Sequence, residues 1–160
     1  MGTCMAVLTA PGCATRAKRD TDQSQVRYQL AVGYFQNHRV EAAVEELQQA
    51  IAADPQNADA YNLLGLVALK QANDYEGQAE ILSCLRGADA QTVRLEENAR
   101  LREAEVHFRK AIELHPEFPE AWNSLSVVAL LLQSWDQAIE AAANGEGESA
   151  GWPSLSTTYG

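Results

Sequence analysis

A short segment that ends in proline occurs twice in this chain, and each copy is followed by the start of a similar segment. Ala50–Pro55 reads Ala-Ile-Ala-Ala-Asp-Pro, and Ala111–Pro116 reads Ala-Ile-Glu-Leu-His-Pro. Beyond these prolines, Ala58–Gly65 and Pro119–Ser126 share an alanine, a large aromatic residue, an asparagine and a leucine at equivalent places. Proline ends a helix because it lacks a backbone N–H and restricts the residue before it. The recurrence predicts helical hairpins that stack on one another to bury their apolar faces.

The repeated unit resembles the tetratricopeptide repeat, a helix-turn-helix of about 34 residues with preferred residue types at positions 4, 7, 8, 20, 24, 27 and 32. With Pro55 at position 32, the first repeat matches except at position 4, where Arg27 replaces the usual aromatic residue. The resemblance covers residues 24–143 and implies an all-α solenoid of about three repeats. The matching residues are Leu30, Ala31, Tyr34, Ala43, Leu47 and Ala50; Tyr61, Leu64, Gly65, Leu101, Ala104, Phe108 and Ala111; and Trp122, Leu125, Ser126, Ala129, Trp135 and Ala138.

The second repeat contains an insertion. Its closing proline lies so far from Pro55 that about 27 residues remain beyond one repeat length. We expect a short apolar helix at Tyr75–Arg86, a break at Gly87–Asp89 and a long charged helix at Ala90–Leu114. Either the second half of the long helix is the second helix of this repeat while 73–97 bulges out, or an extra hairpin enters the stack. The apolar spacing in 101–111 favours the first arrangement.

A solenoid of such repeats has a concave surface, lined mainly by the first helix of each repeat, where an extended peptide or a partner helix can lie. By resemblance, positions 5, 9 and 12 of each repeat point to this groove. The residues at these positions are apolar or uncharged in this sequence, which favours an apolar segment as the ligand. Asn62 and Asn123 would then form hydrogen bonds with the backbone of that segment. The alternative is that these residues are ordinary polar helix faces and core leucines with no ligand. The predicted groove residues are Tyr28, Val32, Phe35, Asn62, Leu66, Leu69, Asn123, Val127 and Leu130.

The N-terminus resembles a bacterial lipoprotein signal, in which a short apolar region and a small residue precede a cysteine that becomes acylated. Gly12 before Cys13 fits this pattern, although no Lys or Arg precedes the apolar stretch. We therefore divide the chain into a leader and linker at 1–22, a repeat domain at 23–143 and a disordered tail at 144–160. The tail has no helical period and provides no polar cap, so we expect the last helix pair to expose an apolar side that a partner, self-association or residues outside this sequence complete.

Charge and motif content exclude several functions. Lys and Arg number 12 against 22 Asp and Glu, so the net charge is −10, and an acidic surface repels nucleic acid. The cysteines Cys4, Cys13 and Cys84 match no metal or disulfide pattern, and His38, His107 and His115 are not paired with other ligands. There is no phosphate-binding glycine loop or Gly-x-Ser-x-Gly motif. We expect no catalytic residues, metal, cofactor or small-molecule substrate.

The leader-like start, the repeats that follow it and the insertion with Cys84–Ala90 resemble the pilotin-type lipoproteins of type IV pilus biogenesis, the PilF, PilW and Tgl group. In that family a tetratricopeptide solenoid tethered to the outer membrane helps secretin subunits to assemble. The resemblance implies a non-enzymatic scaffold that faces the periplasm and binds a secretin or another pilus-assembly protein. Members usually have about six repeats, whereas this chain shows about three. The competing hypothesis is a soluble cytoplasmic adaptor whose residues 1–22 form a disordered arm.

Overall fold

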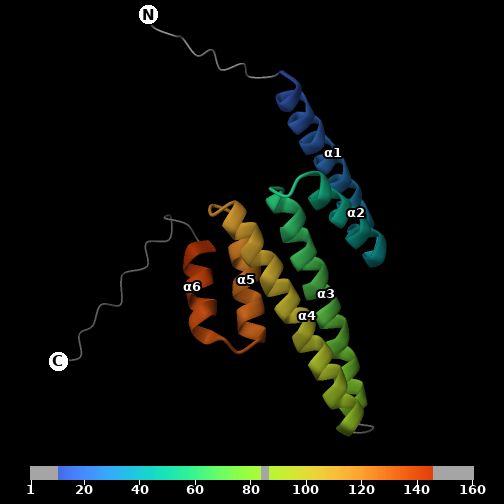
Figure 1. Cartoon of the computed structure of the whole chain (residues 1–160). Coiled ribbons are helices and arrows are strands. Elements are labelled where there is room, and N and C mark those ends of the chain that lie inside the picture. The colour runs from blue at the N-terminus through green and yellow to red at the C-terminus, as the bar shows by residue number, and fades with distance from the viewer. Residues whose placement is uncertain (1–10, 84–86, 146–160) are drawn as a thin grey trace, which may run out of the picture. The chain divides into compact units, whose positions relative to one another are not determined.

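The computed structural model describes the backbone of residues 11–83 and 87–145, with side chains at 18–75 and 91–145, and this part of the chain consists of α-helices without strands (Figure 1). The predicted all-α class is confirmed. The chain divides into two compact units, one that ends at Ala60 and one that begins at Tyr61. The helices are α1 (Pro11–Gln36), α2 (Val40–Ala53), α3 (Ala58–Ser83), α4 (Gly87–Leu114), α5 (Pro119–Leu131) and α6 (Trp135–Gly145).

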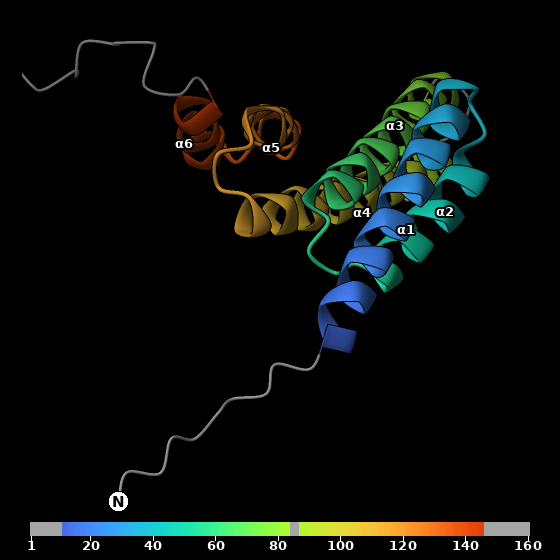
Figure 2. The same cartoon turned by 90° about the horizontal axis from the view of Figure 1, so that it is seen from above.

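In the first unit, α1 and α2 form a hairpin and lie side by side (Figures 1 and 2). Ala31 of α1 and Ala43 of α2, at positions 8 and 20, are fully buried, as the close crossing of the two helices requires. Arg27, which takes the place of the aromatic residue at position 4, forms an ion pair with Glu46 of α2 at 2.8 Å. An ion pair between the two helices therefore occupies the place of the usual aromatic packing.

Asn57 closes the first unit by linking α1 to the start of α3. Its side-chain oxygen accepts a hydrogen bond from the backbone N–H of Ala60 at 3.0 Å, which is the geometry of a helix N-cap. Its amide nitrogen donates to the hydroxyl of Ser24 on α1 at 2.8 Å, and Ser24 is fully buried. The same side chain thus caps one helix and provides a partner for a buried polar group of another.

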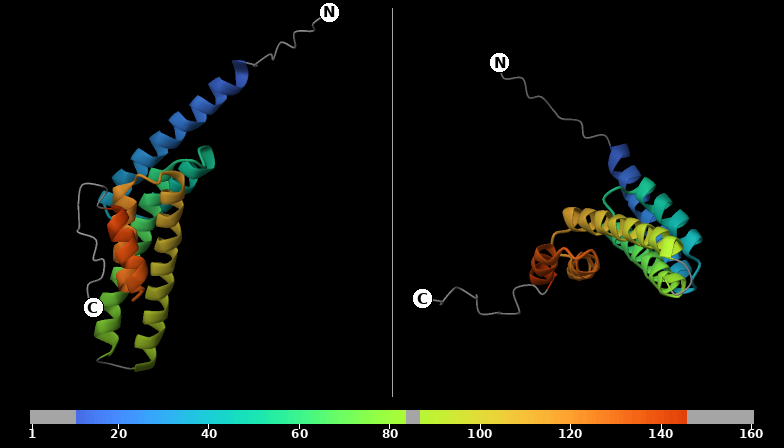
Figure 3. Two further views of the ribbon diagram at one scale, coloured as in Figure 1. Left: turned by 90° about the vertical axis from the view of Figure 1, so that its left-hand side faces the viewer. Right: turned by 90° about the horizontal axis from the view of Figure 1, so that it is seen from below.

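In the second unit, α3 and α4 form a hairpin of 26 and 28 residues, about twice the length of α2 and α5, which have 14 and 13 (Figures 1 and 3). The insertion therefore continues both helices of repeat two beyond the usual turn. Tyr75 of α3 lines one hollow with Glu96 and Arg100 of α4, so the two helices stay together in the extension. The separate helix and the break expected at Gly87–Asp89 were wrong, because these three residues form the first turn of α4.

The register of repeat two is fixed by a close contact between Gly65 of α3 and the ring of Phe108 of α4. A Cβ atom at Gly65 would lie 2.6 Å from the nearest ring atom, and Phe108 is fully buried. This contact confirms that the second half of α4 is the second helix of the repeat. The ring belongs to a core that joins α3 and α4 to α5 and α6, formed by Ala68, Ala72, Leu101, Ala104, Phe108, Ala111, Ile112, Ala121, Leu125, Val128 and Ala141.

Repeat three repeats the backbone geometry of repeat one. His38 and Gln133 are at the same repeat position, and both have left-handed backbone angles, with φ of 58° and 59°. In each turn the next residue donates its N–H to a carbonyl five residues back: Arg39 to Tyr34 at 2.9 Å, and Ser134 to Ala129 at 2.8 Å. The hairpins α1–α2 and α5–α6 therefore share one turn type that closes the first helix.

α6 ends with a glycine that takes the place of Ala50 and Ala111 at position 27. A Cβ atom on Gly145 would overlap the side-chain oxygen of Asn123 and approach Trp122 of α5. At the same end of α5, the indole N–H of Trp122 donates to the carbonyl of Pro116 at 2.8 Å, which ties this helix to the loop that closes repeat two. These contacts hold the end of α6, at Gly145, against the start of α5.

The N-terminal and C-terminal segments lie partly outside the described residues. α1 begins at Pro11, so residues 11–22 of the predicted leader and linker have a helical backbone continuous with the first repeat. Residues 1–10 and 146–160, which include most of the predicted tail, lie outside the described part, and so does Cys84. The leader, the domain boundaries and the disordered tail stay predictions.

Two glycines on first helices form a matched pair for a stability test. Gly65→Ala should destabilise the chain by about 1–3 kcal/mol, because the new methyl group meets the fully buried ring of Phe108. Gly33→Ala should instead stabilise it by about 0.5–1 kcal/mol, because no atom lies within 4 Å and alanine favours the helix. Urea unfolding followed by circular dichroism measures both. Equal effects of the two substitutions would contradict the assigned register.

Candidate protein-binding surface

The nine predicted groove residues lie on the first helices of the three hairpins. Tyr28, Val32 and Phe35 on α1 are half-buried, and so are Asn62, Leu66 and Leu69 on α3. Asn123, Val127 and Leu130 on α5 are exposed. A continuous groove through all nine residues stays a prediction.

In the second unit, the predicted residues form an apolar surface. Leu66 and Leu69 pack against the core from their half-buried positions. Val127 and Leu130 of α5 are 45% and 49% exposed, although the opposite face of the same helix is buried. α5 is thus apolar on two faces, and only one of them is covered in the described part of the chain. An exposed apolar face of this kind is typical of a protein-binding site.

The two equivalent asparagines have different surroundings. The side-chain oxygen of Asn62 is buried and accepts no hydrogen bond within the described residues. The oxygen of Asn123 lies against Gly145 at the end of α6, although the residue as a whole is exposed. Buried acceptors nearly always have a donor. The oxygen of Asn62 therefore lacks a hydrogen-bond donor among the described residues, and a ligand reaches it only if the side chain turns outward.

In the first unit, Tyr28 is the only titratable group among its three predicted residues. Burial raises the pKa of Tyr28, and the nearby carboxylate of Asp59 adds to this effect. The phenol therefore stays neutral at ordinary pH and contributes to the surface as an apolar ring with a hydroxyl group at its end. Val32 and Phe35 continue the same helix face with apolar side chains.

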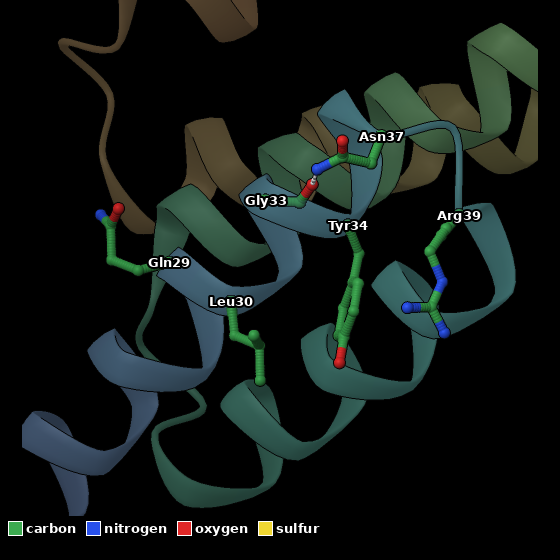
Figure 4. A pocket seen from close by; sticks show the side chains of 6 residues that line it. All are labelled: Gln29, Leu30, Gly33, Tyr34, Asn37 and Arg39. Carbon is green, nitrogen blue, oxygen red and sulfur yellow. Dashed lines mark hydrogen bonds between the residues drawn. The ribbon is translucent and has the colours of Figure 1, made fainter.

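The first unit also has a hollow that sequence reasoning missed. It encloses about 500 Å³ and is lined by Gln29, Leu30, Gly33, Tyr34, Asn37 and Arg39 (Figure 4). The guanidinium of Arg39 lies 4.8 Å from the ring centre of Tyr34, and the amide of Asn37 donates to the carbonyl of Gly33 at 2.7 Å. Leu30 and Tyr34 line this hollow at repeat positions 7 and 11, and nothing in their residue types distinguishes an open face from a covered one.

A second hollow missed by the sequence reading lies at the start of α3 and along α4. It encloses about 490 Å³, and its lining includes Tyr61, Val106 and His107. Half-burial lowers the pKa of His107, while the carboxylate of Glu103 opposes this shift. Charged side chains surround the opening, among them Arg109, which is paired with Glu105 at 2.9 Å. The hollow has no arrangement of acid, base and nucleophile.

The described residues contain neither a metal-binding cluster nor a membrane-spanning helix. No group of three His, Cys, Asp or Glu side chains there is placed to hold a metal ion. None of the described helices has the length and apolarity that a bilayer crossing needs. Cys13 lies in the first turn of α1, and its side chain is outside the described part, so acylation at this residue stays a prediction.

Repeated helical hairpins with small residues at their crossings define a class of solenoid repeat proteins. Two family models match the chain, one described as "TPR repeat" over residues 33–71 and one described as "Tetratricopeptide repeat" over residues 94–151. Both belong to the tetratricopeptide repeat (TPR), and together they cover more than half of the sequence. The chain belongs to the TPR family, whose members generally mediate protein–protein interactions.

Solved structures share this fold. The crystal structure of MamA superimposes with a TM-score of 0.56 at 23% identity over 79% of this chain, which spans 58% of the length of MamA. The second TPR of Spaghetti (RPAP3), bound to the HSP90 peptide SRMEEVD, gives a TM-score of 0.61 at 18% identity over 81% of this chain and 95% of that one. An IFIT1 monomeric mutant with Gppp-AAAA gives 0.65 at 24% identity, over 74% of this chain and 25% of IFIT1.

These identities are low, so the likenesses show the fold alone. A structure of pilF from Pseudomonas aeruginosa also matches, at 19% identity over 81% of this chain and 79% of that one. Its TM-score of 0.32 is too low to carry an argument about function. The comparison with curated proteins finds no match.

The half-buried His107 predicts a pH dependence of stability. Because its pKa is lowered on folding, the unfolded chain binds a proton more readily as the pH falls below about 6.5. The free energy of unfolding should therefore decrease between pH 7 and pH 5.5. In urea titrations His107→Gln should reduce this decrease. An identical pH profile for wild type and His107→Gln would contradict the effect of burial.

Proposed function

We propose that this chain is a non-enzymatic scaffold that holds an apolar segment of a partner protein on the first-helix surface of its second unit. The observation that supports this proposal best is the exposure of Val127 and Leu130 on α5, a short helix whose opposite face is buried in the core. Covering a Val or Leu side chain fully is worth about 1.5–3 kcal/mol, so two half-exposed side chains give a partner segment a useful anchor.

The side chains on α3 add a means of orienting the segment. Leu66 and Leu69 continue the apolar lining from half-buried positions. The oxygen of Asn62 is buried without a donor among the described residues, and it would accept a hydrogen bond from a backbone N–H of the ligand once the side chain turns toward the surface. Such a bond fixes the position of the ligand backbone without reading its side chains. The apolar residues then select the segment by its shape and hydrophobicity.

The chemistry of the lining argues against an acidic ligand. None of the nine predicted groove residues is Lys or Arg. The carboxylates of a peptide such as SRMEEVD, which is bound in the Spaghetti (RPAP3) structure, would find no cationic partner at these positions. The net charge of −10 adds a general repulsion of acidic segments. An uncharged apolar segment is the ligand that this surface favours.

The more specific proposal is an outer-membrane lipoprotein that faces the periplasm and assists assembly of the type IV pilus secretin. It rests on the resemblance of the sequence around Cys13 and in the insertion to the pilotin group. The alternative is a cytoplasmic TPR adaptor for an apolar peptide or helix of another partner. The two proposals share the same binding surface and differ in location and partner.

Val127→Glu tests the binding surface. A carboxylate at the centre of the exposed face of α5 should reduce partner capture at least tenfold, because it would have to be desolvated against an apolar segment. The measurement is affinity capture from extracts of the source cells, followed by quantitative mass spectrometry. Leu95→Glu on α4 is the matched control, since this leucine is also exposed, at 66%, and lies outside the nine groove residues.

Circular dichroism of both variants should equal that of wild type, since the two positions are exposed. A synthetic SRMEEVD peptide serves as the acidic probe and should not bind. If Val127→Glu captures the same proteins in the same amounts as the Leu95→Glu control, or if SRMEEVD binds tightly, the proposed apolar surface is wrong.

Cys13→Ala tests the membrane proposal separately. If Cys13 is acylated, wild type incorporates a fatty-acid analogue and sediments with membranes, because buried methylene groups hold the chain at the bilayer surface. The variant should lose both the label and the membrane association. Cys4→Ala should retain both. A Cys13→Ala protein that stays with the outer membrane, or a wild type that takes up no label, would favour the cytoplasmic adaptor.

A further inference from the structure

The first helix of repeat one exposes a face that is buried in repeat three. On α5, this face lies in the core, where α5 packs against α4. On α1, Val26 is 67% exposed and Leu30 is 43% exposed. At the same repeat positions on α5, Ala121 is 0% exposed and Leu125 is 4% exposed. Gly33 takes the position of a fully buried valine of α5. At these three repeat positions α5 has Ala121, Leu125 and Val128.

This open face of α1 contains the hollow of about 500 Å³ (Figure 4). Gly33 lies in its lining, and no atom lies within 4 Å of the point where a Cβ would be. Leu30 and Tyr34 line the same hollow on one helix face. The hollow therefore has an apolar wall of Leu30 and Tyr34, is open at a glycine and lies where the second helix of a preceding repeat would pack.

The second helix of repeat three has the matching exposed face. Trp135 and Ile139 of α6 lie one turn apart and are 60% and 71% exposed. The α4 residues at the same repeat positions are Leu101, which is 2% exposed, and Glu105. Leu101 belongs to the core that α5 completes, so in repeat two this face is covered by the helix that follows.

We infer that two copies of this chain associate head to tail, with Trp135 and Ile139 of one copy packed into the hollow around Gly33 of the next. α6 then takes the place of α4, and α1 takes the place of α5, so the contact between copies has the arrangement of the α4–α5 contact within one chain. The absence of a side chain at Gly33 leaves space for the indole ring of Trp135.

Charge also favours a second copy as the occupant. Asp136 and Glu140 are exposed beside the two apolar residues of α6. Arg39 lines the hollow, where it lies over the ring of Tyr34. Opposite charges therefore meet when α6 enters the hollow, and the pairing sets the direction of approach. None of these residues belongs to the predicted groove, so the inference does not depend on the proposed function.

An interface between two different faces leaves one face of each kind free at the ends of every assembly. The wild type should therefore form a concentration-dependent series of oligomers in sedimentation velocity. Gly33→Arg fills the hollow, and Ile139→Glu places a charge on the α6 face. Each variant alone should be monomeric, with at least a tenfold weaker association than wild type.

An equal mixture of the two variants provides the decisive measurement. Gly33→Arg keeps an intact α6 face, and Ile139→Glu keeps an intact hollow, so the mixture should form a dimer and nothing larger. Leu95→Glu is the control, since it changes a leucine that is 66% exposed on α4, and it should associate like wild type. Gly33→Gln and Ile139→Ser repeat the experiment if circular dichroism shows a loss of helix in either variant.

Any one of three results would overturn the inference: a wild type that is monomeric up to about 1 mM, a mixture that contains only monomers, or a Gly33→Arg variant that associates as strongly as wild type. If the wild type is monomeric and Gly33→Arg abolishes capture of another protein, the hollow binds a different chain and the head-to-tail contact is wrong. If Val127→Glu loses partner capture but forms the same oligomers as wild type, the contact between α6 and the hollow is a different surface from the predicted groove.

Discussion

The contact between Gly65 and the ring of Phe108 is the constraint on which the second unit depends. The ring occupies the space that a side chain at position 65 would need, and it is fully buried between α3 and α4. This contact fixes which part of the long α4 faces the first helix of repeat two. The burial of Leu101 and the packing of α5 follow from the same register, since these residues share one core.

The register explains how an insertion of about 27 residues is accommodated without loss of the repeat. The described part of the insertion lengthens both helices of one hairpin, so the backbone groups within α3 and α4 keep helical hydrogen bonds and the next repeat still packs on α4. The consequence for function is that α5 retains its place, with one face in the core and Val127 and Leu130 on the other face.

The repeat positions were predictable from sequence because they depend on residue size: Ala31, Ala43, Ala104 and Ala138 are all buried as expected. Three features were not predictable. The continuous helices of the hairpin needed long-range packing to override the expected break at 87–89, and the bond from Asn57 to Ser24 joins residues with no sequence signal. The hollow at Gly33 follows from which repeat faces are covered, and single-residue patterns do not contain that information.

A double-mutant cycle on Gly65 and Phe108 tests the central claim most directly. Gly65→Ala, Phe108→Leu and the double variant are unfolded in urea, and the coupling free energy is calculated from the four proteins. The account predicts a coupling of about 1–3 kcal/mol, because the smaller leucine relieves the overlap with the new methyl group. Additive effects, within about 0.5 kcal/mol, would show that the two residues do not touch and that the register of the repeat is different.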